Sequence, residues 1–285
     1  MNLLIAQEKA GVVQLSQGDW LEKRLPYNVC SACMPCANQV MMACCSAQDQ
    51  ECLCIQKRGY ELICRMPAAP GLCGICLSPC SRYLYQLSAE ADCIHTRLTA
   101  NGDLLYAAPV GVFPRTMRLR GHGTRLIAAG GAVPEAYVLS APDLICQRVI
   151  HTRHPCFAAD ESQEGIVLVC AVEGHDIQTE IYLLKHRTVR PRRLLELPGQ
   201  PGGMCVCPSG RQILLSTPDG LMKISLETGE ILWNRPEWPL CMQLCCQDDW
   251  ALVSDTLDGK AYLISHVHPW ERRVVGHGGA QACFA

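Results

Sequence analysis

A repeated apolar segment runs through this chain and limits the folds open to it. Segments of four to seven residues recur at intervals of 37 to 46 residues. In chain order they are LLIA from Leu3, VMMACC from Val40, YLYQL from Tyr83, RLIAAG from Arg125, IVLVCAV from Ile166, QILLST from Gln212 and ALVSD from Ala251. Their length is typical of a buried β-strand and too short for a helix. A period of this size indicates a protein built from copies of one small unit.

Each unit contains three more short apolar segments. A second segment follows the first, as in EIYLLKH (180–186), and a third follows a turn, as in RRLLELP (192–198). A further segment precedes the first, as in LCGICLSP (72–79). Hairpin turn sequences separate them, such as Asp219-Gly220 and Asn101-Gly102, which supply residues that accept positive φ. Each unit is therefore predicted to contain four antiparallel strands.

Four strands in each of about seven units of about forty residues predict an all-β, seven-bladed β-propeller. We expect a single domain over residues 1–285. The expected blades are blade 1 (29–70), blade 2 (71–111), blade 3 (112–154), blade 4 (155–201), blade 5 (202–239), blade 6 (240–278) and blade 7 (279–285 with 1–28). Blade 7 would take its innermost strand from the C-terminal end and its other strands from the N-terminal end. This closure leaves no free sheet edge, so we expect a monomer.

Blade 5 also resembles a known family. Its sequence GMCVCPSGRQILLSTPDGLMKISLETGEILW is similar to the repeats of the YVTN and quinoprotein-like propellers, in the WD-repeat-like superfamily. The matching positions are Gly210, Asp219, Gly220, Thr228, Gly229 and Trp233. The start of GHGGAQACFA (276–285) looks like the Gly-His start of a WD-repeat, but the chain contains no Trp-Asp dipeptide. The resemblance implies an architecture and brings no active site with it.

The net charge, the N-terminal sequence and the longest uncharged stretch indicate where the protein is located and what it binds. A formal net charge of −2 gives no electrostatic reason to expect nucleic acid or an anionic membrane as a partner. The opening MNLLIAQEKAGVV has no basic region and an apolar run of only four residues, which argues against a secretory signal. The longest uncharged stretch, Leu25 to Gln48, is interrupted by prolines and polar residues. We therefore expect a cytoplasmic protein that binds a protein or a small molecule.

The chain contains 21 cysteines, and a reducing cytosol would keep them as thiols. Many lie on the predicted innermost strands, including the C-x-x-C pairs Cys30/Cys33 and Cys73/Cys76. As thiolates, these four residues are the candidate ligands for a soft metal. On a regular strand, however, residues i and i+3 point to opposite faces, so a bulge or two converging blades would be needed. We favour small apolar packing residues at the crowded centre and predict no cofactor.

Acidic residues follow two of the predicted innermost strands. Asp160 and Glu161 lie at the end of that of blade 4, and Asp248 and Asp249 follow that of blade 6. These turns should lie at one mouth of the central channel, where carboxylates can bind a cation or act as acid and base. Solvated turn residues are the simpler interpretation. We keep the four as candidate ligand-binding residues.

The sequence contains no glycine-rich phosphate loop, no G-x-S-x-G and no H-E-x-x-H, the signatures of common enzyme classes. We therefore favour a non-enzymatic scaffold that binds a protein or small ligand at one channel mouth, with no assigned catalytic residue. Two alternatives stay open. The first is a propeller enzyme of lactonase or dehydrogenase type, which requires carboxylates to converge with a His or Arg. The second is a cysteine-rich metal- or redox-binding protein.

Overall fold

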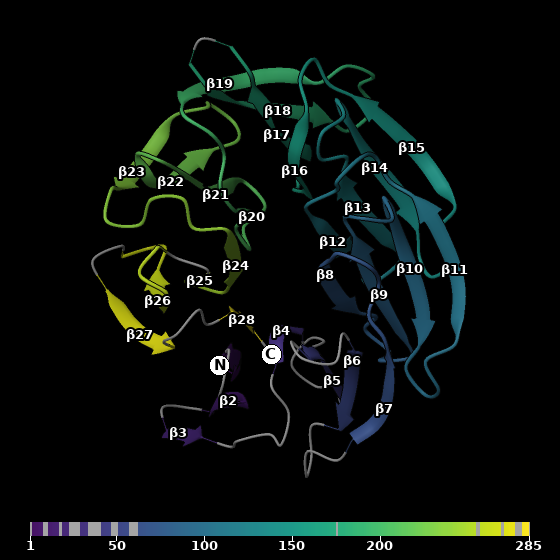
Figure 1. Ribbon diagram of the computed structural model, residues 1–285. Coiled ribbons are helices and arrows are strands. Elements are labelled where there is room, and N and C mark those ends of the chain that lie inside the picture. The colour runs from purple at the N-terminus through teal and green to yellow at the C-terminus, as the bar shows by residue number, and fades with distance from the viewer. Residues whose placement is uncertain are drawn as a thin grey trace.

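The structure is a computed structural model. It describes residues 2–7, 11–16, 19–22, 29–33, 41–46, 51–56, 62–174, 176–254, 257–268, 271–276 and 281–284, with side chains only between residues 51 and 275. The described elements are β-strands, paired antiparallel in four-stranded sheets. The sheets stand radially around one axis, as in a propeller (Figure 1). No helix that could cross a membrane occurs in the described ranges.

Five of the sheets are described almost entirely with their side chains, and they correspond to blades 2 to 6. From the innermost strand outward, their strands are β8 (Leu72–Leu77), β9 (Tyr83–Ser88), β10 (Cys93–Leu98) and β11 (Leu104–Pro109) in blade 2; β12 (Met117–Arg120), β13 (Arg125–Ala129), β14 (Glu135–Ser140) and β15 (Cys146–His151) in blade 3; β16 (Cys156–Glu161), β17 (Gly165–Val172), β18 (Gln178–Lys185) and β19 (Arg192–Pro198) in blade 4; β20 (Met204–Val206), β21 (Gln212–Thr217), β22 (Gly220–Ser225) and β23 (Ile231–Arg235) in blade 5; and β24 (Gln243–Gln247), β25 (Trp250–Ser254), β26 (Ala261–Ser265) and β27 (Arg272–Gly276) in blade 6.

The other strands pair in the same manner, although for most of them only the backbone is described. They are β4 (Val29–Cys33), β5 (Met41–Ser46), β6 (Glu51–Gln56) and β7 (Leu62–Pro67), and β1 (Asn2–Gln7), β2 (Gly11–Ser16), β3 (Asp19–Glu22) and β28 (Gln281–Phe284). In the second group β28 pairs with β1, so strands from both ends of the chain share one sheet. The prediction of a propeller made of four-stranded antiparallel blades is confirmed. Five blades, not seven, are described with their side chains.

Burial within a blade is greatest in the middle strands and lowest in the outermost strand. Residues Leu84 to Ser88 of β9 and Ile213 to Thr217 of β21 are all buried, because both faces of a middle strand pack against neighbouring blades. This double burial explains why these strands are nearly continuous apolar runs in the sequence. The outermost strands have mostly exposed residues: in β11, for example, only Ala108 is buried.

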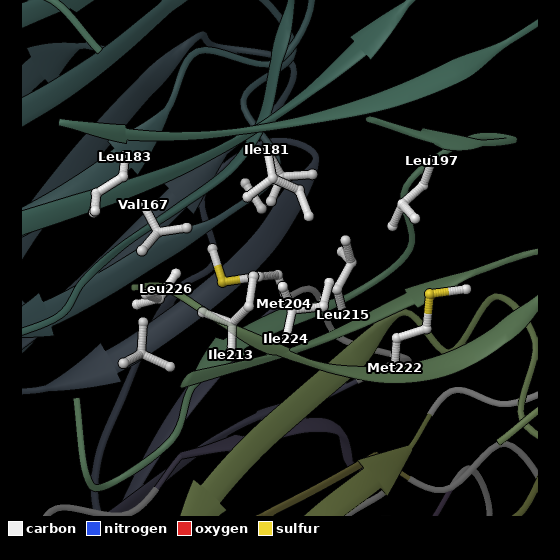
Figure 2. Close-up of a cluster of buried hydrophobic side chains, with 13 residues drawn as sticks. Val167, Ile181, Leu183, Leu197, Met204, Ile213, Leu215, Met222, Ile224 and Leu226 are labelled. Carbon is white, nitrogen blue, oxygen red and sulfur yellow. The ribbon is translucent and has the colours of Figure 1, made fainter. Parts of the chain in front are cut away.

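The core therefore lies between blades. The largest cluster joins blades 4 and 5, where Val167, Ile181 and Leu183 face Met204, Ile213 and Ile224 (Figure 2). Alternate residues of one strand serve different neighbours: Val167 and Val169 face blade 5, whereas Leu168 faces blade 3. Such packing holds the inner strands at fixed positions around the axis, and these strands carry the candidate site.

Candidate functional site at the inner-turn face

The inner strands end on one side of the ring. Because each of blades 2 to 6 begins with its innermost strand and repeats the same strand order, the C-terminal ends of these strands all lie on the same side. The turns that follow them are residues 78–82, 121–124, 162–164, 207–211 and 248–249. We call this side the inner-turn face. All four candidate acidic residues, Asp160, Glu161, Asp248 and Asp249, end or follow an inner strand and therefore lie there.

Asp160 is not an open carboxylate. Its side chain has no exposed surface and forms a bidentate ion pair with Arg120, in which both N–O distances are 2.7 Å. The backbone amides of Glu161 and Val206 donate to the same carboxylate, at 2.8 and 3.3 Å. Burial lowers the pKa of Arg120 and the Asp160 carboxylate raises it, with the rise prevailing. Asp160 thus connects the inner strands of blades 3, 4 and 5.

The other three acidic residues are more accessible. Glu161 is partly buried, and an Oε1–Nη2 distance of 2.7 Å pairs it with Arg125 at the start of β13 in blade 3. Asp248 and Asp249 are exposed. The backbone of Asp248 has φ +50°, and its carbonyl accepts a 2.6 Å hydrogen bond from Nε2 of His266. Of the four candidate carboxylates on this face, two are therefore exposed and two are paired with arginines.

Arg118 lies on β12 two residues before Arg120, so both side chains leave the same face of the strand. Its Nη2 donates to the carbonyl oxygens of Met204 at 3.1 Å and Leu244 at 3.3 Å. These belong to β20 and β24, so Arg118 reaches from blade 3 to the inner strands of blades 5 and 6. Among residues 62–174, 176–254, 257–268 and 271–275, no carboxylate forms an ion pair with Arg118. A guanidinium held by two neutral carbonyls remains available to an anion.

Sequence analysis did not single out Arg118 or Arg120. The signal was present in the segment Met117-Arg-Leu-Arg120, because two arginines two residues apart on an innermost strand must share a face. The partner carbonyls lie 86 and 126 residues away along the chain, so only the folded ring reveals what Arg118 contacts.

The candidate cysteine ligands do not form a described metal site. The side chains of Cys30 and Cys33 lie outside the described residues. β8 has a bulge between Leu72 and Gly74, at Cys73, whose thiol donates to the carbonyl oxygens of Pro114 at 3.2 Å and Leu87 at 3.5 Å. Enclosure by protein raises the pKa of Cys73 to about 11, and Cys76 packs against the core between blades 2 and 3. Among the described side chains, no three His, Cys, Asp or Glu residues gather as metal ligands.

A pocket elsewhere on the molecule is too small to be a better candidate ligand-binding site than the inner-turn face. Its volume is about 110 Å³, and Glu237, Trp238, Pro239, Leu257 and Asp258 line it. These residues belong to the connection before β24 and the turn between β25 and β26, which lie on the side of the ring opposite to the inner-turn face. Sites for small molecules usually exceed about 300 Å³. The arginines and carboxylates of the inner-turn face are therefore the better candidate.

Comparison with known proteins supports the propeller fold. No protein-family model and no curated protein matches the sequence. Among solved structures, the periplasmic gluconolactonase of Pseudomonas aeruginosa is similar over 100% of this chain and 98% of its own, with a TM-score of 0.71 and 13% identity. A putative 6-phosphogluconolactonase of Bacteroides fragilis is similar over 99% and 97%, with a TM-score of 0.70 and 10% identity. At such identities, the likeness concerns the fold.

A dehydrogenase has a similar propeller as part of a longer chain. The dihydro-heme d1 dehydrogenase NirN gives a TM-score of 0.61 at 18% identity over 85% of this chain. The chain spans only 56% of that enzyme's length. The similar structures thus include lactonases and a dehydrogenase, and at identities of 10 to 18% they show the fold that this chain shares with them.

Proposed function

We propose that this protein is a propeller hydrolase of the lactonase type, acting at the inner-turn face on a sugar lactone that carries an anionic group. The observation that carries the proposal is Arg118, a cation on an inner strand whose hydrogen bonds to described residues go to two neutral carbonyl oxygens. Likeness to two lactonase structures over nearly the whole chain supports it. The sequence favours an enzyme if the carboxylates of blades 4 and 6 converge with a His or Arg, and of these carboxylates Asp160 and Glu161 pair with Arg120 and Arg125.

The residues suggest how the substrate would lie. Arg118 would bind the anionic group, since a guanidinium forms strong, directed hydrogen bonds with phosphate or carboxylate oxygens. The lactone ring would then lie toward the ends of the inner strands, near Glu161, Asp248 and Asp249. One of these carboxylates would take a proton from water as the water attacks the lactone carbonyl. The bond to the ring oxygen would break, and the product would be the open hydroxy acid.

The direct experiment compares 6-phosphogluconolactone with gluconolactone, with proton release followed at constant pH and spontaneous hydrolysis subtracted. We expect the phosphorylated lactone to be the better substrate. Arg118→Ala should lower kcat/KM for it by about 10- to 100-fold, the equivalent of one charge-assisted hydrogen bond. Arg148→Ala is the matched control, because Arg148 lies on outer strand β15 and donates to the Thr188 carbonyl at 2.9 Å.

Three outcomes separate the alternatives. Hydrolysis that depends on Arg118 but not on Arg148 supports the proposal. If the Arg118→Ala protein hydrolysed the phosphorylated lactone as fast as the unchanged protein, Arg118 would have no role in binding the substrate. If neither lactone were hydrolysed but the phosphorylated one bound measurably, the result would support the non-enzymatic binding scaffold that the sequence favours.

We also infer that the ring has seven blades. The inner strands contact one another in a closed order, β4, β8, β12, β16, β20, β24 and β28, with β28 beside β4. Pairing of β28 with β1 supplies the innermost strand of the last sheet. A complete ring would hold Arg118 and the carboxylates of the inner-turn face at fixed separations, which preorganised catalysis requires.

A further inference from the structure

Three cysteines meet between blades 5 and 6. Cys205 lies on inner strand β20, Cys207 directly follows that strand, and Cys246 lies on the neighbouring inner strand β24. The Sγ atoms of Cys205 and Cys246 are 3.2 Å apart, and Cys246 also shares a hydrogen bond with Cys207. Cys205 and Cys207 are only 3% and 2% exposed, whereas Cys246 is partly exposed. Cys246 is therefore both the link between the other two thiols and the one that a small molecule can reach.

A buried lysine stands next to this thiol cluster. Lys223 is 8% exposed, and its Nζ donates to the backbone carbonyl of His266 at 2.9 Å and lies 3.5 Å from Nδ1 of the same residue. His266 uses Nε2–H for the Asp248 carbonyl, so its Nδ1 is an acceptor and the ring is neutral. No carboxylate pairs with Lys223 among the side chains described between residues 51 and 275. A buried cation without a carboxylate is costly unless another anion is near.

The thiols can provide that anion. The hydrogen bond with Cys246 and the charge of Lys223 lower the pKa of Cys207, and burial only partly opposes them. Arg120 also interacts electrostatically with Cys205, but it contributes little net charge because Asp160 pairs with it. The cluster therefore stabilises one thiolate, which is the reactive form of cysteine.

A second thiol pair in the same molecule has no such support. Cys156 and Cys170 are cross-strand neighbours in blade 4, both without exposed surface. They share a hydrogen bond, but apolar residues such as Ile127, Leu168 and Leu184 surround them. The hydrogen bond with Cys170 and burial raise the pKa of Cys156 well above its usual value. This pair is the internal control for the cluster between blades 5 and 6.

We propose that Cys205, Cys207 and Cys246 form an oxidation site, at which a hydroperoxide converts Cys205 and Cys246 into a disulfide between blades 5 and 6. The Cys207 thiolate accepts the proton of Cys246 as the Cys246 sulfur attacks the peroxide, because hydrogen bonds and burial raise the pKa of Cys246 well above its usual value. The O–O bond breaks, Cys246 becomes a sulfenic acid, and the departing alkoxide or hydroxide receives the proton from Cys207. Cys205 attacks this sulfur and expels hydroxide, which leaves as water with the Cys205 proton. Two electrons pass from the two sulfurs to one peroxide.

The required movement is small. A disulfide needs an S–S distance of about 2.05 Å, so the two sulfurs at 3.2 Å must approach by roughly 1 Å. β20 and β24 are neighbouring inner strands in contact with each other. In the reducing compartment that the sequence predicts, thiols would be restored by exchange with another dithiol. The site does not depend on the proposed lactonase activity, because neither Arg118 nor an inner-turn carboxylate takes part.

The test uses the full chain, reduced under nitrogen and then exposed to increasing hydrogen peroxide. Free thiols are alkylated, and disulfide-linked peptides are identified by mass spectrometry. We expect Cys205–Cys246 to be cross-linked at peroxide concentrations that leave Cys156 and Cys170 alkylated, and dithiothreitol to reverse the cross-link. Cys246→Ser should abolish it. Cys207→Ser should slow it by about tenfold while leaving the same product, since it removes the proton acceptor.

Two results would overturn the proposal. One is alkylation of Cys205 and Cys246 at every peroxide concentration that oxidises the exposed cysteines Cys80 and Cys146. The other is oxidation of Cys156 and Cys170 at the same rate as the cluster. Cys241→Ser is the matched control for the substitutions, because Cys241 is buried in the same interblade core. Circular dichroism of each variant before oxidation distinguishes a lost thiol from a lost fold.

Discussion

At the scale of single residues, Glu180 shows how the ring accommodates a buried charge. It is 4% exposed in blade 4 and accepts hydrogen bonds from the Tyr182 hydroxyl at 2.5 Å and from Arg193 at 2.7 Å. His154 lies 3.7 Å from the same carboxylate. Burial raises the pKa of Glu180, and the hydrogen bonds and nearby positive charges lower it by more, so the net shift is downward from 4.5.

This shift predicts a pH-dependent effect of Glu180→Gln. A carboxyl group whose pKa is lower in the folded state stabilises the fold above its unfolded pKa and loses that contribution as the pH falls through the folded pKa. The variant should therefore lose about 1 to 2 kcal/mol of unfolding free energy at pH 7, and the deficit should shrink once the pH falls below 4.5. Urea unfolding at several pH values measures it. Glu196→Gln, at an exposed partner of Arg193, should cost little; a deficit that stays constant down to pH 3 would contradict the explanation.

At the same scale, the sequence predicted the positions of acidic residues but not their roles. The strand pattern was enough to expect Asp160, Glu161, Asp248 and Asp249 after inner strands. It could not show that Asp160 is neutralised by Arg120 while Asp249 is exposed, since these differences depend on side chains from other blades. The thiol cluster and Arg118 were missed for the same reason: their partners are 41 to 126 residues away along the chain.

At the scale of elements, the sequence predicted which segments form strands but not where the strands have bulges or which residues form their turns. Middle strands such as β17 and β21 are buried on both faces, so each contains consecutive apolar residues in the sequence. β8 has a bulge at Cys73 and β16 has one at Phe157. A bulge forms where one strand has an extra residue relative to its partner strand, and the sequence of a single strand does not show this. The first hairpin of blade 5 shows the same limit. The sequence predicts its turn at Asp219-Gly220, whereas in the structure Thr217 pairs with Gly220 and the two loop residues are Pro218 and Asp219.

This turn leads to a prediction for Gly220→Ala. Gly220 has φ +123°, and a Cβ there would lie 2.6 Å from Cα of Pro236 and closer still to the Arg235 carbonyl oxygen. Strain and overlap together should lower the unfolding free energy by about 2 kcal/mol or more. Gly174→Ala is the control, because its Cβ would have no neighbour nearer than the Asp176 carbonyl oxygen at 3.7 Å. Chemical denaturation of both variants measures the difference, and equal stabilities would show that the turn can relax.

At the scale of the whole molecule, the inferred closure of the ring depends on a short pairing between a strand near each end of the chain. Residues Leu3 to Ala6 of β1 pair with Gln281 to Phe284 of β28, and β28 also contacts the neighbouring inner strands β4 and β24. Every other described sheet is continuous in sequence, so this pairing is the one described place where closure relies on distant segments.

Deleting residues 281–285 should therefore affect more than one blade. The deletion leaves β1 with an unpaired edge, which favours association between molecules, and it removes contacts that hold β4 and β24 in place. We expect a lower melting temperature, by ~2–4 °C for each kcal/mol lost, and concentration-dependent aggregation in light scattering. Deletion of Ala285 alone is the control, because it leaves the β1–β28 pairing intact. If the ring is the closed assembly inferred above, the longer deletion should also reduce lactone hydrolysis, since Arg118 bridges to Leu244 on β24. A shortened chain with unchanged melting temperature and aggregation would show that β28 does not hold the ring closed.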